Sequence, residues 1–170
     1  TAGTLAGVSR VLRRERPDVK IIVSEPDGAA LFSDGAPQMR NPDGSASESH
    51  PAWTPHPIQG WTPDFIPLIA EEPIDNNAID AVKIVKGADG IHWSKRLAAE
   101  EGIFTGISGG STFATAIDVA AEAEKGSRIL CMLPDTGERY LSTPLFGDIE
   151  AEMNEDEIVI AHSTPGQHVS

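Results

Sequence analysis

The stretch from residue 106 to residue 143 constrains the fold more than any other part of this 170-residue chain. It begins with Ser108 set among glycines and continues with apolar residues at helical spacing. An apolar run at 128–133 has the composition of a buried strand and ends in a polar, glycine-containing turn. Both turns are therefore expected at the carboxyl edge of a parallel sheet, where open α/β folds bind ligands.

The remaining pattern predicts further helices and strands of the same fold class. Apolar residues at helical spacing begin at Leu5, and Pro17 ends that helix. Glycine at 102 is placed as the C-cap of a later helix. This alternation predicts an α/β fold with a mostly parallel twisted sheet flanked by helices. The other expected elements are strands at 20–24 and 80–85, a helix at 88–101 and a strand end at 103–106.

Residues 26–64 are rich in Pro, Gly, Ser and Asp and have no sustained periodicity, which predicts a long irregular segment. Segments of this length in compact domains are usually functional or mobile. His50 and His56 have no third His or Cys at ligand spacing, so we expect no metal site there. Trp53 and Trp61 are expected to pack beneath the loop.

The charge and cysteine content limit the kinds of partner. The formal net charge of −13 argues against binding to nucleic acid or an anionic membrane, because both need clustered Lys and Arg. No apolar run reaches the about 20 residues that cross a bilayer, so we expect a soluble, cytoplasmic protein. The single cysteine, Cys131, fits a reducing compartment, and its apolar neighbours indicate a core residue.

Several of these motifs together resemble a known family. The Gly-Ile-Ser-x-Gly motif at 106–110 and the Gly-Glu-Arg-Tyr-Leu-Ser-Thr run at 137–143 resemble the C-terminal half of the cysteine synthase (O-acetylserine sulfhydrylase) family. These are pyridoxal-phosphate (PLP) enzymes of fold type II. Residues 1–8 resemble the phosphate loop of the family, and residues 58–60 with 65–67 resemble its active-site loop. The resemblance covers about residues 1–146. It implies an enzyme portion incomplete at its N-terminus, followed by an acidic tail at 147–170.

The resemblance implies specific roles for a few residues. PLP would be bound through its phosphate by Thr1, Ala2, Gly3 and Thr4, and through its ring nitrogen by the Ser108 hydroxyl. Gly60 would line the substrate pocket. From the residues alone, small side chains at a helix start fit either a phosphate site or an ordinary turn. Ser108 and Ser111 each also fit a helix N-cap, which is the preferred interpretation of Ser111.

Two departures from the family pattern affect these roles. Ala2 stands where a glycine is usual and adds a methyl group near the phosphate. The bulky segment 61–64 replaces a run of small residues, which fits either altered substrate selectivity or drift within a loop. Glu138, Arg139 and Tyr140 are consecutive and point in different directions, so we expect them to stabilise the fold or a dimer.

For the whole enzyme, the resemblance implies conversion of O-acetyl-L-serine and sulfide to L-cysteine and acetate. It also implies a homodimer and a possible serine acetyltransferase partner. No lysine of the chain stands in a context like that of the family's Schiff-base lysine, which we expect upstream of Thr1, so the segment alone should be inactive. The alternatives are another fold-type II β-replacement enzyme such as cystathionine β-synthase, or a non-catalytic fragment of the fold. The five lysines of the chain are Lys20, Lys83, Lys86, Lys95 and Lys125.

Overall fold

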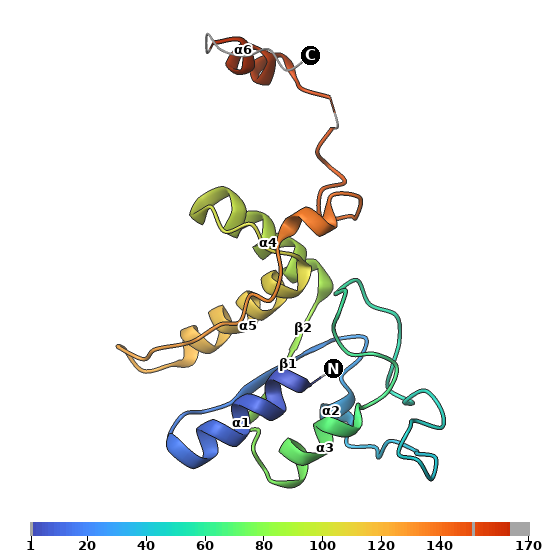
Figure 1. Ribbon diagram of the computed structural model, residues 1–170. Helices are drawn as coiled ribbons and strands as arrows, with labels where there is room; N and C mark the ends of the chain where they lie inside the picture. The colour runs from blue at the N-terminus through green and yellow to red at the C-terminus, as the bar shows by residue number, and fades with distance from the viewer. Residues whose placement is uncertain (1, 151, 164–170) are drawn as a thin grey trace.

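The computed structural model describes residues 2–150 and 152–163 (Figure 1). Helices and strands alternate along the chain, and the prediction of an α/β fold with a parallel sheet flanked by helices is confirmed. In chain order the elements are α1 (Gly3–Glu15), β1 (Ile22–Pro26), α2 (Leu31–Asp34), α3 (Leu68–Asp75), β2 (Ala81–Val85), α4 (Gly87–Glu101), α5 (Ile107–Glu122), the 3-10 helix η1 (Gly137–Tyr140) and α6 (Glu155–Ser163).

The sheet consists of β1 and β2, which pair in parallel with Ile22 opposite Ala81 and Pro26 opposite Val85. Both strands were predicted, although β1 begins two residues later than expected. Pro26 lies at the strand end, where a residue without an N–H group is tolerated. Helix α1 packs against α3, and α5 contacts both strands, so the helices flank the sheet (Figure 1).

Helices α4 and α5 cross in close backbone contact. A Cβ atom at Gly110 of α5 would overlap the Gly90 carbonyl oxygen and the Ser94 hydroxyl of α4. Ser94 Oγ also donates a hydrogen bond of 2.7 Å to the carbonyl of Gly106, which immediately precedes α5. The start of α5 is therefore fixed against α4 by contacts that leave no room for a side chain at the crossing.

Two buried clusters form the core and involve the long segment 26–64. The first cluster joins this segment to β2, α5 and η1, and the second lies beneath α2 and α3. The segment 26–64 therefore belongs to the packed domain. The first cluster contains Ile58, Val85, Ile107, Ala114, Tyr140 and Leu145. The second contains Ala29, Leu31, Ile66 and Ala70.

Arg40 fixes the middle of this segment. Its guanidinium donates to the carbonyl oxygens of Gly44, at 3.1 Å, and Ile66, at 2.8 Å. It also forms a 2.5 Å ion pair with Glu71 of α3. Since Arg40 is largely buried, these bonds replace the hydration that its charge loses.

The predicted strand at 128–133 and the predicted strand end at 103–106 are wrong for the described structure. Both segments are non-helical, and neither has a ladder partner among the described residues. Leu130 is 97% exposed and Met132 53%. A strand exists only when a neighbouring strand satisfies its backbone groups, which an apolar composition alone cannot provide. Cys131 is consequently half-buried outside any strand, and its partial burial raises the pKa of its thiol.

Helix α6 lies in the acidic tail, and its first turn contains Glu155, Asp156 and Glu157. None of its described residues is buried, and it lies apart from the other helices (Figure 1). The proposed boundary after residue 146 stays a prediction. Within the described part of the chain, no helix combines the length and hydropathy that a bilayer span requires.

Candidate functional site

A cavity of about 250 Å³ lies where the loop at 59–61 faces the start of α5 and the turn that leads into η1. It brings together Gly60 and Ser108, two of the residues singled out from the sequence. Their roles toward a ligand stay predictions. The residues that line this cavity, called here the Ser108 cavity, are Gln59, Gly60, Trp61, Ser108, Pro134, Asp135 and Tyr140.

Ser108 is the second residue of α5 and is buried. The helix begins at Ile107 after the extended residue Gly106, with no side-chain cap and no acidic residue in its first turn. The interpretation of Ser111 as an N-cap is therefore wrong. Ser111 lies inside the helix, where its Oγ donates at 2.8 Å to the Ile107 carbonyl, a bond available to serine within a helix.

Asp135 links the start of α5 to η1. Its Oδ1 accepts a hydrogen bond of 3.2 Å from the Gly106 N–H, and its Oδ2 accepts one from the Tyr140 hydroxyl. A Cβ atom at Gly106 would overlap the Tyr140 ring and lie 2.8 Å from Asp135 Oδ1. Only glycine at position 106 lets the carboxylate and the ring approach the backbone this closely.

The pKa of Tyr140 is raised, first by burial and then by the Asp135 carboxylate, while the Ser108 hydroxyl and Arg139 act in the opposite direction. Tyr140 therefore stays protonated, and its hydroxyl donates a hydrogen bond to Asp135. The sequence indicated only a fold- or dimer-stabilising role for Tyr140 and did not pair it with Asp135. The available signal was an acid and a phenol five residues apart in a turn at the sheet edge.

The opposite wall of the cavity is held in an unusual backbone conformation. Gly60 has φ of 82° and Thr62 has φ of 28°, both in the left-handed region that favours glycine. The Thr62 carbonyl accepts a 3.2 Å hydrogen bond from Trp53 Nε1, and His56 Nε2 lies 3.2 Å from the same oxygen. Trp61 packs against the first cluster. These contacts fix the loop without a ligand.

The start of α1 has the features of an anion site. Ala2 precedes the helix with φ of 61°, no side chain caps the first turn, and that turn contains no acidic residue. A helix start in this state exposes N–H donors and a partial positive charge. A left-handed conformation at Ala2 also explains why glycine is expected there. Gly3 begins the helix and Thr4 is exposed in its first turn, whereas Thr1 lies outside the described residues.

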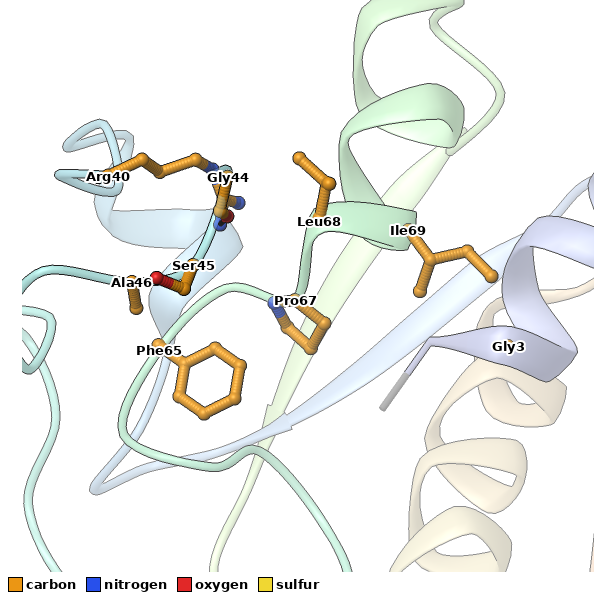
Figure 2. A pocket seen from close by; sticks show the side chains of 9 residues that line it. All are labelled: Gly3, Arg40, Gly44, Ser45, Ala46, Phe65, Pro67, Leu68 and Ile69. Atoms are coloured by element: carbon orange, nitrogen blue, oxygen red, sulfur yellow. Dashed lines mark hydrogen bonds between the residues drawn. The ribbon is translucent and has the colours of Figure 1, made fainter. Parts of the chain in front are cut away.

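Gly3 borders a different cavity, of about 430 Å³, formed by the loop at 40–46 and the segment 65–69 (Figure 2). Figure 2 shows Pro67, Leu68 and Ile69 between that loop and the start of α1. Of the site residues predicted from the sequence, Gly3 thus borders this cavity, while Gly60 and Ser108 border the other.

No lysine of the described chain lines either cavity. Lys83 forms a 3.0 Å ion pair with Glu122, and Lys95 forms a 2.5 Å ion pair with Asp148. Each of these two amines is thus held by a carboxylate away from the cavities. The described residues therefore offer hydrogen-bonding groups to a ligand, but no lysine amine at either cavity.

The fold and the Ser108 cavity define a class: α/β proteins with a cavity beside a glycine-flanked helix start. A family model described as "Pyridoxal-phosphate dependent enzyme" matches residues 1–135. The chain therefore belongs to the family of PLP-dependent enzymes, and PLP is the cofactor of that family.

Individual relatives narrow the similarity. The chain is 43% identical over 150 residues to O-ureido-L-serine synthase of Streptomyces lavendulae, covering 88% of this chain and 40% of the relative. It is 36% identical over 146 residues to cysteine synthase of Staphylococcus aureus, covering 86% of this chain and 41% of the relative. The chain thus spans about two fifths of the curated relatives that it matches.

Solved structures of PLP-dependent enzymes are also similar to this chain. A ligand-bound mutant of O-ureido-L-serine synthase matches with a TM-score of 0.75 and 38% identity, over 96% of this chain and 45% of the other. An O-acetylserine dependent cystathionine beta-synthase from Helicobacter pylori matches with a TM-score of 0.67 and 29% identity, over 85% and 40%. These similarities confirm the resemblance to fold-type II PLP enzymes.

Proposed function

We propose that this chain forms the C-terminal part of a PLP-dependent β-replacement enzyme of the cysteine synthase type. The observation that carries the proposal is the Ser108 cavity, where a buried hydroxyl at a helix start faces the glycine loop at 59–61. The family membership and the similarity to cysteine synthase support it.

The residues fit PLP at two points. The uncapped first turn of α1 suits a phosphate, so residues 1–4 would hold it through backbone N–H groups. The Ser108 hydroxyl suits the ring nitrogen, and the backbone at Gly60 would line the substrate side. When bound, PLP would supply the electron sink for chemistry at the substrate Cα and Cβ. The Schiff-base lysine is proposed to lie outside this sequence.

The proposed reaction exchanges one substituent of the substrate Cβ for another. The Cβ–O bond of O-acetyl-L-serine breaks and acetate leaves, and sulfide forms the new Cβ–S bond of L-cysteine. The chain's own contribution is to orient the reactants and to exclude water, for which the fixed loop at 59–62 is suited. A homodimer and docking of a serine acetyltransferase remain part of the proposal.

A second candidate is favoured by the 43% identity to O-ureido-L-serine synthase. In a β-replacement, an O-ureido product requires the hydroxyl oxygen of hydroxyurea as the nucleophile. The side-chain amide of Gln59 in the cavity wall offers hydrogen bonds to a polar nucleophile. The two candidates share the substrate and the leaving group and differ only in this nucleophile.

The test is a competition assay on the protein that contains this chain together with its Schiff-base lysine. O-acetyl-L-serine is supplied with sulfide, hydroxyurea and homocysteine, and the products are quantified by mass spectrometry. Cysteine as the main product supports the first candidate, O-ureido-L-serine the second, and cystathionine the cystathionine β-synthase alternative. Absence of acetate release with every nucleophile would reject β-replacement.

A further inference from the structure

Ser108 shares its cavity with a hydrogen-bonded pair of residues. The Tyr140 hydroxyl donates to Asp135 Oδ2, and all three residues line the same cavity. Ser108 and Tyr140 are both buried. The surroundings of Ser108 therefore include two residues that come from a different part of the chain.

Asp135 controls the position of Ser108 through the backbone. Its Oδ1 accepts the Gly106 N–H at 3.2 Å, two residues before Ser108, and the Thr105 hydroxyl donates at 3.3 Å to the Asp135 carbonyl. The Tyr140 ring packs directly on Gly106, because a Cβ atom there would overlap it. Movement of Asp135 or Tyr140 would therefore move the first turn of α5.

The pair also controls which group donates a proton in the cavity. A phenol has one hydroxyl proton, and Tyr140 uses it in the hydrogen bond that it donates to the Asp135 carboxylate. Tyr140 therefore has no proton to offer a ligand, and Ser108 is the other hydroxyl residue in this cavity wall that can donate to one. Without Asp135, the Tyr140 hydroxyl would be free to donate to a ligand in place of Ser108.

We propose that Asp135 and Tyr140 are positioning residues that hold Ser108 as the hydrogen-bond donor to the ring nitrogen of PLP. This inference rests on the proposed function. The pair acts in two ways. Asp135 fixes the backbone that carries Ser108, and it accepts the Tyr140 hydrogen bond, so that the Tyr140 hydroxyl does not compete with Ser108 as donor to the ring nitrogen. A purely structural pair would stabilise the fold without distinguishing the ring nitrogen from any other part of the cofactor.

The test compares two ligands that differ only at that atom, PLP and 1-deaza-PLP, in which a C–H group replaces the ring nitrogen. Binding to the apo form of the protein that contains this chain is followed by fluorescence titration. The aldehyde and phosphate are common to both ligands, so their contributions cancel in the ratio of affinities. In the native protein we expect PLP to bind about three- to tenfold more tightly than 1-deaza-PLP, as one hydrogen bond allows.

Three variants report on the inference. Ser108→Ala should abolish the preference for PLP. Tyr140→Phe keeps the ring, and Asp135→Asn keeps an acceptor for the Gly106 N–H while its amide cannot accept the Tyr140 proton at that position. Both should reduce the preference, and neither should reduce it further when combined with Ser108→Ala. Ser111→Ala removes a buried hydroxyl of α5 that does not line the cavity, and should leave the preference unchanged.

The outcomes separate the inference from the proposed function. Equal weakening of both ligands in Tyr140→Phe and Asp135→Asn would mean that the pair is only structural, and a rise in the preference would mean that Tyr140 competes with Ser108. Either result overturns the inference while leaving the Ser108 assignment intact. If Ser108→Ala itself leaves the preference unchanged, the proposed role of Ser108 fails first.

Discussion

Glu25 shows how a single buried charge organises the chain beside the sheet. It is 2% exposed, and its carboxylate accepts hydrogen bonds from Phe32 N–H at 2.7 Å, Ser33 N–H at 3.0 Å and Ser33 Oγ at 2.8 Å. The end of β1 is thereby joined to α2, where the long segment begins. A buried carboxylate is tolerated because donors replace the lost water.

Glu25→Ala should therefore lower the free energy of unfolding by about 2–3 kcal/mol, because it removes three hydrogen bonds that the buried carboxylate accepts. Urea denaturation measures the change. Glu122→Ala is the matched control, since its exposed carboxylate pairs with Lys83, and it should cost less than about 1 kcal/mol. An equal loss in the two variants would contradict the account of Glu25.

Asp80 is expected to make the stability depend on acid pH. The Ile21 N–H donates to its Oδ2 at 2.6 Å, and this bond, followed by the Arg13 guanidinium, lowers the pKa of the carboxyl below its ordinary value. The stabilisation is thus present above the unfolded-state pKa, about 3.9, and is lost as pH falls through the folded-state value. Asp80→Asn should lose less stability than the native chain when urea unfolding is compared at pH 6 and pH 2. An identical loss would show that Asp80 is not linked to folding.

At the scale of elements, the crossing of α4 and α5 determines where Ser108 lies. Gly110→Ala should destabilise the chain by about 1–3 kcal/mol, because the new methyl group meets the Gly90 carbonyl and Ser94. Gly7→Ala, in the interior of α1, meets nothing within 4 Å and should stabilise by about 0.5–1 kcal/mol. Thermal unfolding distinguishes opposite shifts of the two variants from a shared helix-propensity effect, which would stabilise both.

Local patterns were sufficient for the elements that depend on local signals. Helix α4, with Gly102 at φ 68° as its C-cap, and the strand β2 follow their predicted bounds within a residue. Helix α3 was missed, because it is only 8 residues long and contains Pro73. The segment 128–133 was assigned to a strand on composition, although strand formation depends on a neighbour that no local pattern reports.

In the candidate site, too, features with a local sequence signal could be predicted, and features that depend on distant contacts could not. The residues Gly60 and Ser108 could be singled out because glycine and serine motifs carry them, and the structure places both at one cavity. The contact of Asp135 and Tyr140 with Gly106 could not be derived, because it forms only when η1 turns back onto that residue. Their roles toward PLP stay predictions.

Across the whole molecule, apolar side chains remain on the surface of the described chain. Leu130 is 97% exposed, Leu141 65% and Ile84 of β2 47%. Exposed apolar surface of this kind is usually an interface or a source of association. Leu130 also lies in a non-helical segment that has no ladder partner among the described residues, a position that favours edge-to-edge pairing.

We therefore expect the 170-residue chain alone to self-associate, and Leu130→Lys to reduce that association without lowering the unfolding temperature. Light scattering coupled to size-exclusion chromatography measures the mass, and thermal unfolding measures the stability. Unchanged association in this variant would mean that copies of the chain do not associate through the segment 128–133.

The central claim is that one PLP molecule is held at its phosphate by the first turn of α1 and at its ring nitrogen by Ser108. A crystal structure of the PLP-bound protein that contains this chain tests it most directly. The account predicts phosphate oxygens within hydrogen-bonding distance of the backbone N–H groups of residues 3–5, and a ring nitrogen about 2.7–3.2 Å from Ser108 Oγ. A cofactor that reaches only one of these two sites would contradict the account.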